Sequence, residues 1–167
     1  MCLGIVGIMM EEKTANVEAE ERQHDKIAKL IAKTGELLKK KSKISFEFNG
    51  RFLDVVWKDK ENEGPSHVFE VLVSGDIDRD LMKLKHARLK FNAQPIYVVT
   101  TKENELKANR YLQGSLPEMK GIIKIMTREM FEKLYESLRT AIEILEKDLR
   151  TKMHTVLRQK AWEPDRE

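Results

Sequence analysis

Residues 44–57 read ISFEFNGRFLDVVW and residues 67–73 read HVFEVLV, and these two stretches decide the fold. The Asn49-Gly50 pair between two strand-like runs is a strong hairpin signal, so the first stretch predicts two antiparallel strands. The second stretch is almost continuously apolar, as expected of a strand that is covered on both faces. Each stretch nevertheless carries a carboxylic acid in its interior, and that anomaly bears on function.

The segments on either side of these strands alternate between helix-like and strand-like patterns. Hairpin-like connections join the first strands and helical segments join the later ones, so we expect an α/β fold with a mixed five-stranded sheet flanked by helices. The predicted elements are a helix over residues 16–40, strands over 44–48, 51–57 and 67–73, a helix over 77–91, a strand over 95–100, a helix over 102–112, a strand over 121–126 and a helix over 127–158.

Length and composition limit the class of protein. A chain of 167 residues with 41% apolar residues predicts one domain with a substantial core. The charged fraction of 35%, rich in Lys and Glu, exceeds the usual ~25% and suits the surface of a thermophile's protein. A single Cys excludes a disulfide scaffold and favours a reducing, cytoplasmic setting. No apolar run approaches the ~20 residues of a membrane span, so no membrane association is expected.

We expect the chain to divide into four parts. The predicted parts are a flexible or poorly ordered N-terminus over residues 1–15, an α/β core over 16–127, a long C-terminal helix over 128–160 and a frayed tail over 161–167.

Asp54 and Glu70 are the two acids within the decisive strands. Strand alternation places Asp54 on the face of Phe52 and Val56. A buried acid is costly unless it meets donors or a cation, and two on neighbouring strands would repel each other. A hard divalent cation such as Mg²⁺ would neutralise both. The alternative is that each acid lies at a strand end, where it bonds to backbone groups or pairs with Arg51 or Lys85.

The order αβββαβ, with Asp54 in the second strand and Glu70 in the third, resembles the PD-(D/E)XK nuclease superfamily, which has the restriction-endonuclease-like fold. The resemblance extends from about Gln23 to Met126. It implies that Asp54 and Glu70 hold Mg²⁺ or Mn²⁺, and that Glu36 or Glu47 supplies an extra carboxylate.

The sequence departs from this motif at one position. The motif lysine, which helps to place and deprotonate the attacking water in that family, is replaced by Leu72. Lys85 and Arg88, at or near the apolar stripe of the next helix, are the candidate substitutes. The alternative is that both extend their stems over apolar surface.

Two basic groups are candidates for contact with phosphates. The first lies on the polar side of the 77–91 helix and comprises Arg79, Lys83, His86 and Lys90. The second just precedes the first strand and comprises Lys39, Lys40, Lys41 and Lys43. The alternative for each group is a surface that contacts only solvent.

The last helix carries apolar residues in a heptad rhythm. The positions are Phe131, Tyr135, Leu138, Ile142, Leu145, Leu149 and Val156, interrupted at Lys152. About half of this seam should cover the core, and the rest predicts a homodimer through the C-terminal helix. At the other end, residues 1–7 resemble the start of two families that use Cys2 as a thiolate, but nothing downstream continues either resemblance.

The sequence therefore predicts a metal-dependent endonuclease or exonuclease that hydrolyses DNA phosphodiester bonds. The alternative is a catalytically inactive module that keeps this fold to bind nucleic acid or a protein partner.

Overall fold

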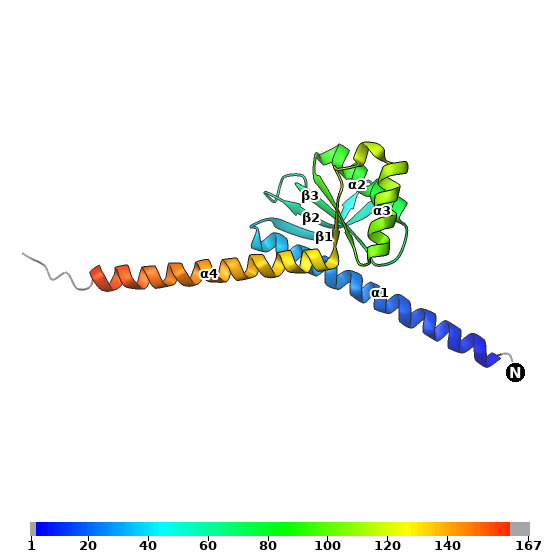
Figure 1. Ribbon diagram of the computed structural model, residues 1–167, viewed down its shortest axis with the longest axis horizontal. Helices are drawn as coiled ribbons and strands as arrows, with labels where there is room; N and C mark the ends of the chain where they lie inside the picture. The colour runs from blue at the N-terminus through cyan, green and yellow to red at the C-terminus, as the bar shows by residue number, and fades with distance from the viewer. Residues whose placement is uncertain (1–2, 161–167) are drawn as a thin grey trace, which may run out of the picture.

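The structure, a computed structural model, describes the backbone of residues 3–160 and the side chains of residues 15–149. Figure 1 shows the arrangement of the elements. In chain order they are α1 (Leu3–Leu37), β1 (Lys41–Phe48), β2 (Arg51–Lys58), β3 (His67–Leu72), α2 (Ile77–Phe91), β4 (Gln94–Val99), α3 (Lys102–Gly114), the 3₁₀ turn η1 (Pro117–Met119), β5 (Lys124–Thr127) and α4 (Arg128–Lys160).

The five strands form one mixed sheet in the order β1-β2-β3-β4-β5. Strand β2 is antiparallel to both β1 and β3, whereas β3, β4 and β5 run parallel to one another. Helices α2 and α3 lie in the connections between the parallel strands, as parallel pairing requires. The predicted α/β class and mixed five-stranded sheet are therefore confirmed.

Local sequence signals account for the main turns. Asn49 and Gly50 both have positive φ, 52° and 69°, which a two-residue hairpin turn of this kind requires. Asp76 caps α2, because its Oδ1 accepts hydrogen bonds from the backbone N–H groups of Asp78 at 3.0 Å and Arg79 at 3.3 Å. The cap fixes where α2 begins and hence which of its side chains reach the sheet.

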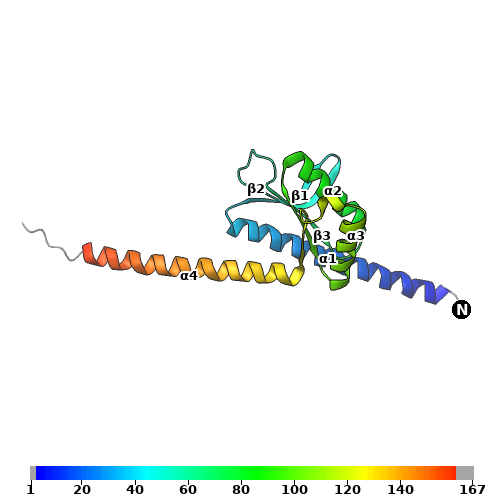
Figure 2. The ribbon, with the colours of Figure 1, turned by 45° about the horizontal axis from the view of Figure 1, so that its top comes forward.

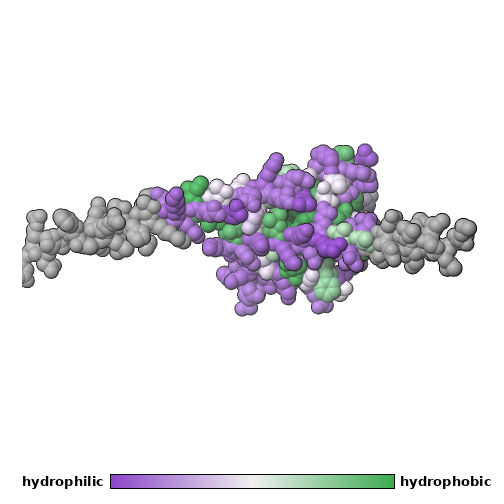
Figure 3. All heavy atoms as spheres, turned by 90° about the horizontal axis from the view of Figure 1, so that it is seen from below, coloured by the Kyte–Doolittle hydropathy of each residue, from purple (hydrophilic) through white to green (hydrophobic). Residues whose placement is uncertain are grey.

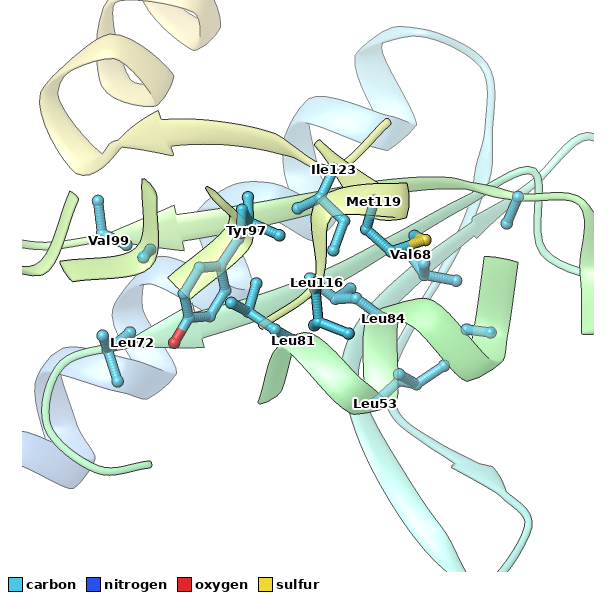
Figure 4. Packing of buried hydrophobic residues seen from close by; sticks show 14 of the residues in the cluster. Leu53, Val68, Leu72, Leu81, Leu84, Tyr97, Val99, Leu116, Met119 and Ile123 are labelled. Atoms are coloured by element: carbon cyan, nitrogen blue, oxygen red, sulfur yellow. The ribbon is translucent and has the colours of Figure 1, made fainter. Parts of the chain in front are cut away.

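Helices cover both faces of the sheet and divide the core into two layers. Helices α1 and α4 pack on one face and α2 and α3 on the other. Figure 4 shows the layer beneath α2, where Tyr97 lies among aliphatic side chains of the strands and helices. The layer beneath α1 is built from Ile27, Ala28, Ile31, Ala32, Val55, Trp57, Phe69, Val71, Ile96, Val98 and Phe131.

The structure corrects two expectations. Helix α1 begins at Leu3 rather than near residue 16, whereas the flexibility expected of residues 1–15 stays a prediction. The strand alternation also breaks within β2: Leu53 packs with Val56 in the α2-side layer, although alternation predicts opposite faces. The expected frayed tail over residues 161–167 and Cys2 lie outside the described residues.

Helices α1 and α4 extend beyond the sheet in opposite directions, which both ribbon views show (Figures 1 and 2). The two helices contact each other where they cross the same face of the sheet. The view of Figure 3 shows a largely hydrophilic surface with small hydrophobic areas between the polar groups. Among the described residues, no helix has the length and apolar character needed to span a membrane.

Candidate functional site

Asp54 lies where β2 and β3 separate. Strand β2 pairs with β3 through Val55, Val56 and Trp57, and within the described strands Asp54 takes part in neither the β1 ladder nor the β3 ladder. Its Oδ2 instead accepts a hydrogen bond of 2.7 Å from the backbone N–H of Val71. The carboxylate therefore fills the gap between the two strands, and 18% of its side chain is exposed.

His24, on α1, contacts the same carboxylate. Its Nε2 lies 3.1 Å from Asp54 Oδ2, and its Nδ1 lies 3.8 Å from Asp25 Oδ1. The hydrogen bond to Asp54 raises the pKa of His24, against the opposing effect of partial burial. His24 is not among the site residues predicted from the sequence, although one signal was present: this polar residue falls on the same helical stripe as Ile27 and Ile31.

Glu70 is fully buried on the α2 side of the sheet and forms an ion pair with Lys83 of α2. Beyond this ion pair, its two carboxylate oxygens accept no hydrogen bond from the described residues. Lys83 Nζ also lies 3.3 Å from Asp80 Oδ1 and donates a hydrogen bond of 3.3 Å to the carbonyl oxygen of Phe52. One ammonium group therefore links α2, β2 and β3.

Burial and nearby charges shift the pKa values of Glu70, Asp80 and Lys83. Burial, with a further contribution from the nearby Asp54, raises the pKa of Glu70 to about 9, against the opposing effect of Lys83. Burial also raises the pKa of Asp80, whose Oδ2 lies 3.4 Å from the hydroxyl of Tyr97. Burial acts against the charged form of Lys83, but the surrounding carboxylates outweigh it and raise its pKa. The site concentrates carboxyl groups around one cation.

The two candidate substitutes for the motif lysine do not reach the carboxylates. Lys85 Nζ lies 2.5 Å from Glu118 Oε1, because its side of α2 faces η1 rather than β2. Arg88 Nη1 donates hydrogen bonds to the carbonyl oxygens of Asn92 at 3.0 Å and Ala93 at 3.2 Å, just beyond the end of α2. The structure thus corrects the expected position of the basic group.

The two residues expected to supply an extra carboxylate, Glu36 and Glu47, do not join Asp54 and Glu70 in one cluster. Glu36 lies near the end of α1, about 18 Å along the helix from His24. Glu47 is exposed on β1, where it pairs in register with Phe52. Across the residues that the structure describes, no three His, Cys, Asp or Glu side chains are grouped as ligands of a metal ion.

The two basic groups lie at different distances from the site. On α2, Arg79, His86 and Lys90 are exposed, but Lys83 turns inward and only 12% of its side chain is exposed. The lysines at residues 39–43 surround the start of β1, at the end of the hairpin opposite its turn. Lys41 pairs with Lys58, about 13 Å along β2 from Asp54, and Lys43 pairs with Val56, about 7 Å from Asp54, so the second group is offset from the carboxylates along β2.

Comparisons of the chain with protein-family models, with curated proteins and with solved structures find no match.

Proposed function

We propose that the protein is a metal-dependent nuclease of the PD-(D/E)XK type that hydrolyses DNA phosphodiester bonds, with Lys83 in the role of the missing motif lysine. The observation that carries the proposal is the ion pair of Lys83 with Glu70 beside Asp54. The succession αβββαβ, with one acid on β2 and one on β3, supports it. Lys83 comes from α2 and would supply the ammonium group that the apolar Leu72, at the motif position, does not carry.

The donor set fits a hard divalent cation. Beyond its ion pair with Lys83, Glu70 presents two buried oxygens that accept no hydrogen bond from the described residues, so it has fewer donors than a buried carboxylate ordinarily has. Asp54 and Glu70 would hold Mg²⁺ or Mn²⁺, with water or phosphate oxygens as the remaining ligands. A metal bound there would supply an activated water and stabilise the charge that develops on the phosphate.

The neighbouring side chains have separable roles in this proposal. The raised pKa of Lys83 keeps its ammonium group protonated near neutral pH, so Lys83 takes only the placing part of the motif lysine's role: it donates hydrogen bonds to the water or phosphate, and the proton of the water goes to solvent. His24 and the N–H of Val71 both bind Oδ2 of Asp54. They hold the carboxylate in place and leave Oδ1, to which no described residue donates, for a cation.

The test is Mg²⁺- or Mn²⁺-dependent cleavage of single-stranded, duplex and branched DNA. We expect Asp54→Asn and Lys83→Met each to reduce the rate by roughly a hundredfold or more, because each removes a group that acts on the reacting phosphate. Lys85→Met is the matched control, since Lys85 lies on the same helix but pairs with Glu118. Full-rate cleavage by Asp54→Asn, or equal losses for the two lysine variants, would contradict the proposal.

One observation favours the second candidate, a catalytically inactive nuclease-fold module that binds nucleic acid or a protein partner. The described residues lack a third metal-ligating side chain beside the two carboxylates. If that reading holds, the wild-type protein binds nucleic acid or a protein partner, does not cleave DNA with either metal, and Asp54→Asn leaves binding unchanged.

A further inference from the structure

Phe52 is unusual among the aromatic side chains of this protein. Within residues 15–149 it is the only aromatic residue with an exposed side chain, at 58%. It lies on β2 two residues before Asp54 and close to the Asn49-Gly50 turn. Its backbone carbonyl accepts the hydrogen bond from Lys83, so the ring and the proposed catalytic lysine share one short segment.

A cavity of about 220 Å³ opens beside this ring. Its lining combines apolar side chains, among them Phe52, with the cationic groups of Arg51 and Lys83, and it contains no carboxylate. The lining residues are Phe48, Asn49, Arg51, Phe52, Leu53, Lys83 and His86. Two other hollows have a different chemistry: one carries Glu20, Glu21 and Asp25, and the other combines lysines and glutamates without an aromatic ring.

This combination of groups suits one flat aromatic ring attached to a phosphate. Nucleobases stack on aromatic side chains whatever their sequence, and cationic side chains hold the adjoining backbone. The cavity is smaller than the 300–1,000 Å³ typical of sites for larger ligands, which favours a single ring system. Arg51 and His86 are exposed and can reach a phosphate outside the cavity.

Lys83 connects the cavity to the reacting centre, because it lines the cavity and also pairs with Glu70. A base seated against Phe52 would therefore place its backbone next to Asp54 and Glu70. A base inside a duplex is paired and stacked on its neighbours, so it is not available to such a cavity without being extruded.

We infer that this cavity binds one unpaired nucleobase next to the bond that is cut, so that the substrate of the proposed nuclease is single-stranded DNA or the unpaired part of a branched DNA. This inference rests on the proposed function, whose substrate class it narrows.

The test measures binding without metal, so that it does not depend on cleavage. In EDTA, the affinities of the full-length protein are measured for a labelled single-stranded oligonucleotide and for a duplex of the same sequence. Phe52→Ala should weaken binding of the single strand by about tenfold and change duplex binding less than twofold, because it removes one stacking surface. Phe52→Trp should retain the affinity, and Phe52→Leu should lose it as alanine does, since leucine has no flat face.

Leu106→Ala is the control, because Leu106 is 49% exposed on α3 and does not line the cavity. A second readout places 2-aminopurine at an unpaired position, where the wild type should quench its fluorescence and Phe52→Ala should not. Unchanged single-strand binding by Phe52→Ala, or equal losses for single strand and duplex, would overturn the inference and leave the proposed function standing. A wild type that binds neither DNA would overturn the inference, and the metal-dependent cleavage assay decides the proposed function separately.

Discussion

At the scale of single residues, Glu70 is an acid in an environment that disfavours its charged form. It is fully buried, its pKa is raised to about 9, and Lys83 is the one cation that the described residues bring to it. In the unfolded chain the same carboxyl group ionises near its ordinary pKa of about 4.3. Between these two values the folded protein binds more protons than the unfolded chain does.

This difference in proton binding determines whether the free energy of unfolding rises or falls with pH. Because the folded pKa is raised, the contribution of Glu70 to stability is fully present below the unfolded pKa and is lost as the pH rises through the folded pKa. In metal-free buffer, the free energy of unfolding should therefore fall between about pH 5 and pH 9, with Glu70 contributing at most ~1.4 kcal/mol per pH unit. Glu70→Gln should flatten this slope, as measured by urea unfolding at several pH values.

Glu118→Gln is the control for this slope. Glu118 is an exposed acid whose pKa is lowered by Lys85, so it titrates below the window and its loss should leave the slope unchanged. The slope is the relevant quantity, because removing one partner of a buried ion pair also changes stability at any single pH. Equal slopes for the wild type and Glu70→Gln would contradict the raised pKa of Glu70.

The residues of the site differ in how far the sequence could predict them. An acid inside an apolar strand is visible in the sequence, so Asp54 and Glu70 could be found. The alternative to metal binding was a hydrogen bond from the backbone, and the structure shows such a bond for Asp54 but not for Glu70. The basic partner could not be chosen, because Lys83 and Lys85 flank the buried arc of α2 on opposite sides. A helical wheel shows both flanks but not which one faces β2.

At the scale of elements, the attachment of α1 to the sheet holds His24 over the site. Near the end of this helix, Trp57 Nε1 donates a hydrogen bond of 3.1 Å to the carbonyl oxygen of Ile31, and Ser42 Oγ donates one of 2.9 Å to that of Ala32. Gly35 lies directly beneath these two side chains. The close approach of α1 to β1 and β2 therefore depends on the missing side chain at residue 35.

Gly35→Ala should destabilise the protein by about 1–2 kcal/mol. A Cβ at this position would collide with Ser42 Oγ and with the indole of Trp57, and this overpacking outweighs the better helix propensity of alanine. Gly114→Ala, at the end of α3, is the matched control because a Cβ there meets nothing within 4 Å. The measurement is the midpoint of urea unfolding. A gain in stability for Gly35→Ala would show that Ser42 and Trp57 leave room for a Cβ, in contradiction to the close approach of α1 to β1 and β2.

Element types were easier to predict than element ends. The predicted order of helices and strands is confirmed, because each core-facing segment carries its own apolar period. The ends differ where that period is absent. Helix α1 begins with the uniformly apolar residues 3–10 and continues through the polar, charged residues 11–26, and β1 begins at Lys41 rather than at residue 44, where its first residues are largely exposed. Such segments lack the periodic apolar pattern from which a boundary could be inferred.

At the scale of the whole molecule, α4 packs on the core over only part of its length. The seam begins at Phe131, which is buried, and continues through partly buried Leu138 and Ile142. Further along, Leu145 and Leu149 are each 62% exposed although the heptad rhythm continues. The prediction that about half of the seam covers the core is consistent with this decay in burial. The seam position at Val156 lies outside the described side chains.

The homodimer through α4 remains a prediction, and the seam supplies its test. A second copy of this helix is the partner whose apolar residues repeat at the same spacing, so pairing would cover Leu145 and Leu149 together. Leu145→Glu should then weaken self-association at least tenfold, because it places a charge within the apolar seam. The thermal unfolding of the core should stay unchanged. Ile144→Glu is the matched control: Ile144 is 63% exposed, close to the 62% of Leu145, but lies one residue off the seam. Sedimentation equilibrium measures both; a monomeric wild type, or equal effects of the two variants, would mean that the exposed seam of α4 does not bind a second copy.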